Sequence, residues 1–332
     1  MKRIIGIILV VSLLALTLVG CAGDDSADGG HIVFADAGWD SIKLHNALAG
    51  LIAGELYGYT WEEVPGSSPV THEGVLSGEI DVHMEEWTMN IPTYEEDVAQ
   101  GKMQQLSVNF DDNRQGFYVP RYVIEGDSEK GIEAMAPDLK TVEDLKNYPD
   151  VFPDEENANK GRVYGAIPGW DADDLMFAKY EYYGLDEDFI YFRPGSDPAL
   201  SAALSNAYER GEAVVGYYWE PTWLMGKYDF VFLEEPEADP DTFKDGASAI
   251  PATDTTVVMS NKFYEVEDNK DLIEFLSNYK TSSALISEAL AHIQDTGDDY
   301  KETAEWFLKE NDDLLDEWLN EEDAQTIRDY LN

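Results

Sequence analysis

Short apolar strands alternate with helical segments along this chain, and this alternation constrains the fold more than any other feature. The first series predicts strands over 31–35, 60–64 and 80–84, with helices over 41–57 and 69–77 between them. Apolar residues recur at helical spacing over 41–57, and Ser41 stands at the expected N-cap. Strand–helix–strand units of this kind build mostly parallel sheets covered by helices, so an α/β fold is expected.

A second series with the same alternation follows in the middle of the chain. It predicts strands over 163–167, 189–192 and 214–218, with helices over 172–183 and 198–210 between them. An extended segment at 115–125 leads out of the first series, and a strand at 255–259 leads back to it. The pattern predicts a discontinuous first lobe, residues 31–115 and 250–332, and a second lobe at 116–249. Two α/β lobes that face each other are the layout of a hinged binding protein.

Tryptophans stand directly after strands in both series. Trp87 follows the strand at 80–84, Trp170 follows Pro168 and Gly169, and Trp219 follows the strand at 214–218. Ligands of open α/β sheets bind outside the carboxyl ends of the strands. Several indole faces that meet at one point favour a cation without N–H donors, because such a cation interacts with the negative ring face.

The first residues have the pattern of an exported lipoprotein. Lys2 and Arg3 precede an apolar stretch at 4–18, and residues 1–20 are predicted to be a signal peptide. Leu18-Val19-Gly20-Cys21 has the form of a bacterial lipobox, and Cys21 is the one cysteine of the chain. We expect lipidation at Cys21, a flexible tether over 21–30, and a location at the cell membrane on its extracytoplasmic face. A signal peptide with a chance cysteine is the alternative.

The chain is strongly acidic. It has 68 Asp and Glu against 22 Lys and Arg, which gives a formal net charge of −46. Removal of residues 1–20 would take away Lys2 and Arg3 and bring the net charge to −48. This balance argues against nucleic acid and against anionic membrane surfaces as partners. The acidity indicates either solubility or adaptation to high salt, where screening relieves self-repulsion.

Three segments together resemble the substrate-binding lipoproteins of ABC importers for glycine betaine, proline betaine and related quaternary amines. The matching segments are 76–87, 168–170 and 208–223, and the resemblance runs from about residue 31 to residue 318. It implies a two-lobed, type II periplasmic-binding-protein-like fold with a hinge of crossing strands. It also implies an ABC permease as the membrane partner and no catalytic activity.

The resemblance implies a box of three tryptophans around a trimethylammonium group. By motif these are Trp87, Trp170 and Trp219. A quaternary ammonium has no N–H to donate, so indole faces recognise it by apolar contact and by the ring quadrupole, about 2 kcal/mol for each desolvated face. Trp61, Trp306 and Trp318 occupy core-like positions and are predicted to be structural, with Trp223 as a support behind Trp219.

The carboxylate of a zwitterionic ligand needs a separate partner. The resemblance implies the backbone amides of Asp171 and Ala172 at a helix N-terminus, with Asn90 as a further side-chain donor. Related sequences carry small or neutral residues after this tryptophan, whereas Asp171, Asp173 and Asp174 are acidic here. We expect these acids to point outward and to balance the charge of the helix N-terminus.

Acidic residues flank two of the expected cleft positions. Trp39 follows the first strand and is a candidate fourth wall of the box, while Asp40 and Ser41 are candidates for contacts there or for helix capping alone. Glu85 and Glu86 precede Trp87. One of them in the box would favour a pure cation over a zwitterion, and exposure of one to solvent is the interpretation we favour.

No motif for catalysis or for a cofactor stands out. The five histidines lack metal-ligand spacing, and there is no nucleophile elbow, P-loop or dinucleotide fingerprint. We therefore expect a monomeric solute receptor without cofactor or metal, which binds glycine betaine or a related quaternary amine. A receptor tuned to choline, carnitine or a sulfonium osmolyte is the alternative, and a lipid-anchored hydrolase is a more distant one.

Overall fold

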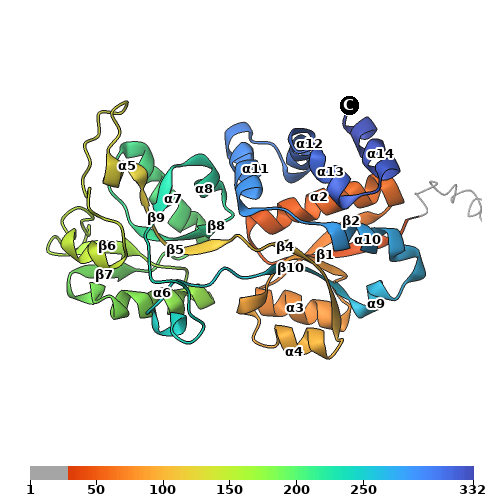
Figure 1. Cartoon of the computed structure of the whole chain (residues 1–332), viewed down its shortest axis with the longest axis horizontal. Coiled ribbons are helices and arrows are strands. Elements are labelled where there is room, and N and C mark those ends of the chain that lie inside the picture. The colour runs from red at the N-terminus through yellow and green to blue at the C-terminus, as the bar shows by residue number, and fades with distance from the viewer. Residues whose placement is uncertain (1–28) are drawn as a thin grey trace, which may run out of the picture.

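The computed structural model describes residues 29–332, apart from the side chain of Asp171, and consists of two lobes (Figure 1). The predicted signal peptide, Cys21 and most of the tether lie outside the described residues. The first lobe holds the strands β1 (His31–Asp36), β2 (Thr60–Pro65), β3 (Val82–Trp87), β4 (Met103–Phe110) and β10 (Thr255–Ser260). The second lobe holds the strands β5 (Arg114–Pro120), β6 (Gly161–Tyr164), β7 (Phe189–Phe192), β8 (Gly216–Glu220) and β9 (Phe230–Phe232).

Both sheets have the same strand arrangement. The orders are β2-β1-β3-β10-β4 and β7-β6-β8-β5-β9. In the first sheet β10 pairs antiparallel with both neighbours, and in the second sheet β5 does so, while the other pairs are parallel. In each sheet the antiparallel strand, β10 or β5, is the one that directly follows a connection from the other lobe. The predicted α/β fold in two lobes is confirmed, and each sheet is mixed, with two parallel and two antiparallel strand pairs.

Helices cover both faces of the first sheet. One face carries α2 (Asp40–Tyr57), α10 (Lys270–Asn278), α11 (Ser283–Thr296), α12 (Tyr300–Glu310), α13 (Asp313–Trp318) and α14 (Glu321–Leu331). The other face carries α3 (Ser68–Ser77) and α4 (Tyr94–Ala99), and α9 (Asn261–Tyr264) follows β10. None of the helices in the described part of the chain is long and apolar enough to cross a membrane.

The second lobe carries fewer helices. They are α5 (Arg121–Glu125), α6 (Asp171–Tyr182), α7 (Asp197–Arg210) and α8 (Trp223–Lys227). Helix α8 follows strand β8 of the second lobe but packs against α11 of the first lobe (Figure 1). A Cβ at Gly226 would collide with the backbone of Ser287, so glycine permits this close approach.

The start of helix α2 differs from the prediction. The helix begins at Asp40, and Trp39 is the N-cap residue without a side-chain capping bond. Ser41 lies inside the helix, and its hydroxyl donates to Glu85 Oε1 at 2.9 Å. Ser41 therefore does not cap the helix, because its hydroxyl bonds to the buried carboxyl group of Glu85 on the neighbouring strand β3.

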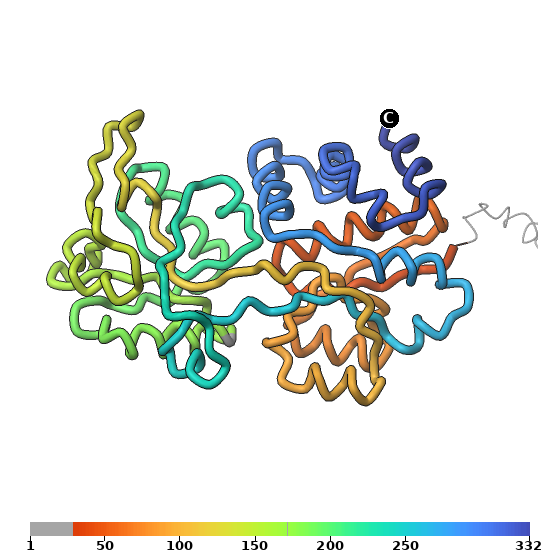
Figure 2. The backbone as a smooth tube through the Cα atoms, viewed as in Figure 1, coloured from red at the N-terminus to blue at the C-terminus, as the bar shows by residue number. Residues whose placement is uncertain are grey.

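Two connections join the lobes and run side by side in the backbone trace (Figure 2). One passes from β4 to β5 through residues 111–113, and the other passes from β9 to β10 through residues 233–254. Asn113 on the first connection bonds to Thr253 on the second. The lobes are thus linked by paired segments, which is a geometry that permits hinge motion.

Candidate functional site

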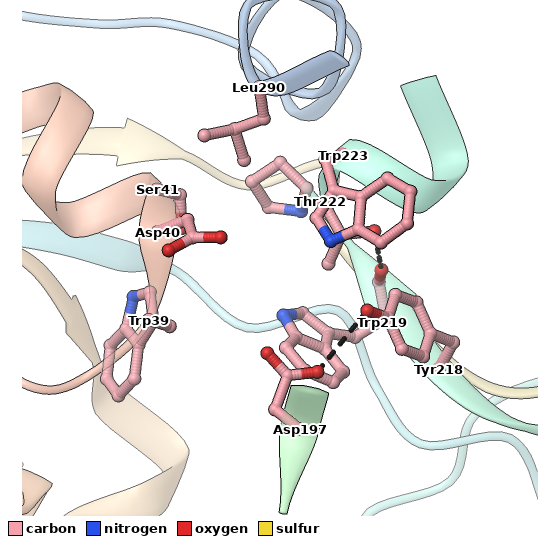
Figure 3. A pocket seen from close by; sticks show the side chains of 10 residues that line it. Trp39, Asp40, Ser41, Asp197, Tyr218, Trp219, Thr222, Trp223 and Leu290 are labelled. Atoms are coloured by element: carbon pink, nitrogen blue, oxygen red, sulfur yellow. Dashed lines mark hydrogen bonds between the residues drawn. The ribbon is translucent and has the colours of Figure 1, made fainter. Parts of the chain in front are cut away.

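A cavity lies between the lobes, and both of them contribute side chains to it (Figure 3). Its first-lobe lining consists of Trp39, Asp40, Ser41 and Leu290. Its second-lobe lining consists of Asp197, Tyr218, Trp219, Pro221, Thr222 and Trp223. Trp39 and Trp219 thus reach the same cavity from opposite lobes.

Local geometry at the carboxyl ends of two strands positions the tryptophans. After β1 the chain turns at Gly38, whose φ of 98° suits glycine, and the Gly38 amide donates to Asp36 Oδ1 at 2.9 Å. Trp39 follows at the N-cap of α2. Trp219 lies near the end of β8, so both indoles stand where ligands of α/β sheets bind.

Aromatic rings support Trp219 from two sides. Tyr218 stacks on it with ring centroids 4.7 Å apart and an interplanar angle of 29°. Trp170, the N-cap residue of α6, meets it edge to face at 5.2 Å and 77°. Trp223 lines the same cavity, whereas the sequence suggested only a support behind Trp219. Trp170 itself is not among the lining residues, but four other aromatic side chains are, and an aromatic lining is suited to a methylated cation.

Trp87 occupies a deeper position. It is 8% exposed, packs edge to face on Phe110 with centroids 6.0 Å apart, and is not among the residues that line the cavity. Its Nε1 donates to Glu85 Oε1 at 3.0 Å, and this is the oxygen that also accepts from Ser41. Trp87 is thus linked to the cavity wall through Glu85.

Glu85 and Glu86 are both buried, so the interpretation that one of them faces solvent is wrong. Strand β3 lies in the middle of the sheet with helices on both faces, and this placement removes both side chains from water. Glu86 Oε1 bonds to His72 Nδ1 at 2.7 Å. Burial raises the pKa of Glu85 to about 8, so this carboxyl is mostly protonated at neutral pH. Burial lowers the pKa of the neighbouring His45 to about 3, and its ring is neutral.

Two carboxylates face the cavity from opposite lobes. Asp40 Oδ1 accepts from the Tyr300 hydroxyl at 2.8 Å, and Asp197 Oδ1 accepts from the Tyr218 hydroxyl at 3.3 Å. The pKa of Asp197 is raised to about 6. Burial is the larger cause, and the negative charge of Asp40 is the second. No Lys, Arg or His lines this cavity within residues 29–332. The cavity therefore combines aromatic walls with negative charge.

The residues predicted to bind a ligand carboxylate lie elsewhere. Asn90 belongs to a short 3₁₀ turn at Thr88–Asn90, and Asp171 and Ala172 form the first turn of α6. None of the three is among the residues that line the cavity, and the side chain of Asp171 lies outside the described part. Asp173 does not point outward as expected. It is buried, and its carboxylate accepts from Arg193 Nε at 2.8 and 3.0 Å.

The tryptophans predicted to be structural pack away from this cavity. Trp318 is fully buried and donates to the Lys280 carbonyl at 3.0 Å. Trp61 meets Phe34 edge to face, and Trp306 stacks on His292. Asp197, Tyr218, Thr222 and Leu290 were missed as lining residues. The repeated aromatic pattern at 217–223 was the one available signal for Tyr218 and Thr222, and no sequence signal pointed to Asp197 or Leu290.

Two lobes with a shared cavity and paired connections define a two-lobed substrate-binding protein. The family model for the substrate-binding domain of ABC-type glycine betaine transport systems matches residues 30–310. The chain belongs to this family, whose members are transport receptors that work outside the cytoplasm.

Relatives agree with this assignment. A glycine betaine/carnitine transport binding protein of Listeria monocytogenes is 28% identical over 138 residues, which span 42% of each chain. The glycine betaine/L-proline-binding protein of Borrelia burgdorferi has a TM-score of 0.64 at 20% identity, covering 90% of this chain and 99% of that one. A choline-binding protein in complex with choline has a TM-score of 0.62 at 20% identity, covering 91% and 98%. A lactococcal glycine betaine complex has a TM-score of 0.61 at 18% identity, covering 88% and 100%.

Proposed function

We propose that the cavity between the lobes binds the trimethylammonium group of glycine betaine or a related quaternary amine. The observation that carries this proposal is that Trp39 and Trp219 face one cavity from opposite lobes. Among the residues that the structure describes, no basic side chain lines it. Desolvated indole faces attract such a cation, and its methyl groups gain apolar contact. Relatives named for glycine betaine, carnitine and choline support the same ligand class.

Binding across the cavity would couple ligand capture to lobe closure. A cation between Trp39 and Trp219 contacts both lobes, so it favours the conformation in which they lie close together. We propose that the closed receptor, a monomer, delivers its ligand to an ABC permease. In this proposal the lobes follow the predicted bounds, residues 31–115 with 250–332 and residues 116–249, except that the second lobe begins two residues earlier, with β5 at Arg114. The anchor is a lipid on Cys21 at the extracytoplasmic face of the membrane.

The remaining predicted contacts form part of this proposal. Trp170 supports Trp219 edge to face. Trp87 fixes Glu85, which in turn holds Ser41 at the cavity wall. The amides of Asp171 and Ala172 and the side chain of Asn90 stay predicted contacts for the far end of a ligand.

Isothermal titration calorimetry with glycine betaine, choline and carnitine tests the proposal. We expect micromolar binding of at least one of them, and about a tenfold loss or more in Trp219→Ala, because one face of the cage is removed. Trp306→Ala is the matched control, since Trp306 stacks on His292 away from the cavity. The absence of heat with every quaternary amine would refute the proposal. An equal loss of affinity in both variants would show that the ligand does not bind at Trp219.

A further inference from the structure

Asp40 and Asp197 bring a negative charge to the cavity from each lobe. Asp40 is the first residue of α2, and Asp197 is the first residue of α7. Both side chains line the cavity that also holds Trp39 and Trp219 (Figure 3). We propose that Asp40 and Asp197 are specificity-determining residues that select a quaternary ammonium without a carboxylate over a zwitterion. This inference rests on the proposed function of the cavity.

The partners of both carboxylates leave their charge in place. Asp40 accepts from the Tyr300 hydroxyl and Asp197 accepts from the Tyr218 hydroxyl, and neither phenol carries a positive charge. Within residues 29–332, neither carboxylate takes part in an ion pair. Two basic residues of the second lobe pair with other acids, Arg193 with Asp173 and Lys227 with Asp295. Both carboxylates therefore keep a negative charge at the cavity wall, where it favours a ligand cation.

The N-termini of α2 and α7 could each attract a ligand carboxylate, but Asp40 and Asp197 already place a negative charge there. The positive end of a helix attracts anions, and α2 and α7 span 18 and 14 residues. Their first residues, Asp40 and Asp197, supply that anion from the chain itself. The charge of Asp40 also raises the pKa of Asp197, which agrees with two carboxylates that act on each other across the cavity. A third carboxylate brought in by a ligand would meet repulsion from both.

Choline and glycine betaine form a matched pair of probes. Both carry the same trimethylammonium group, and they differ at the other end, where choline has a neutral hydroxyl and glycine betaine has a carboxylate. The aromatic walls therefore treat both alike, and the difference in affinity reports on the charge near the far end. At the effective dielectric of a protein surface, a unit charge about 5 Å from a carboxylate contributes enough for a tenfold preference or more.

Calorimetry with both ligands on the whole protein tests this inference. We expect the wild type to bind choline at least about tenfold more tightly than glycine betaine. Asp197→Asn and Asp40→Asn should each weaken choline about tenfold, and should leave glycine betaine unchanged or tighter. Asp188→Asn is the control, because this exposed residue of the second lobe makes the same charge change away from the cavity. The two carboxylates lie on different lobes. If one of the two variants does not fold, the other variant still tests the inference.

Two results would overturn the inference and spare the proposed function. One is glycine betaine binding as tightly as choline with a retained dependence on Trp219. The other is an equal loss of both ligands in the two Asp→Asn variants. The absence of binding by either ligand would instead overturn the proposed function together with the inference.

Discussion

The side-chain amide of Asn113 bonds to both backbone groups of Thr253. Its Oδ1 accepts from the Thr253 amide at 3.0 Å, and its Nδ2 donates to the Thr253 carbonyl. The two residues lie on different connections between the lobes, and both are buried. This pairing holds the two connections together at the place where any rotation of the lobes must occur.

Asn113→Ala should destabilise the protein by about 1–3 kcal/mol, because the buried amide and carbonyl of Thr253 lose their partner. The free energy of unfolding from urea titration measures this change. Asn159→Ala, at an exposed loop position, is the control and should lie within about 0.5 kcal/mol of the wild type. Equal midpoints for the two variants would show that the pairing does not contribute to stability.

Gly226→Ala should also destabilise the protein, by about 1–3 kcal/mol, because its Cβ would collide with the backbone of Ser287 and push α8 away from α11. The melting temperature measures the effect. Gly195→Ala is a matched control, since a Cβ there meets no atom within 4 Å. If both variants melt at the wild-type temperature, the α8–α11 contact is looser than the structure shows.

The pH dependence of the unfolding free energy should show the effect of the raised pKa of Glu85. Its pKa of about 8 in the folded protein exceeds the usual 4.5, so the native state holds the proton more tightly than the unfolded state. The stabilisation is therefore complete at low pH and is lost as pH rises from about 4.5 to about 8. Glu85→Gln keeps an acceptor for Ser41 and Trp87 but cannot ionise.

Urea unfolding at pH 5, 7 and 9 measures the contribution of Glu85. We expect the stability of Glu85→Gln to fall less with pH than that of the wild type, by more than about 1 kcal/mol between pH 5 and pH 9. Glu79→Gln changes an exposed carboxylate and should follow the wild-type profile. Parallel profiles for all three proteins would contradict the raised pKa.

Local sequence patterns were sufficient for much of the fold. Apolar periodicity is a property of neighbouring residues, and it located the strand at 189–192 and the helices that became α6 and α7 to within one residue at most ends. The same patterns placed Trp39 after a strand, where the structure has it, whereas Trp219 lies within β8, because this strand begins and ends two residues later than predicted. They misjudged Glu85, because its burial depends on helices that are distant in the sequence.

The sequence by itself determined the alternation of elements, the two-lobed α/β class, and that tryptophans stand near the carboxyl ends of strands. These features follow from periodicity and from turn chemistry, which act over a few residues. Only the tertiary structure decided that Asp40 faces Asp197 and that Leu290 joins the lining. Those contacts join segments more than 60 residues apart, and they depend on how two sheets and the helix pair α8 and α11 come together in space. Local sequence patterns do not specify how these distant segments pack together.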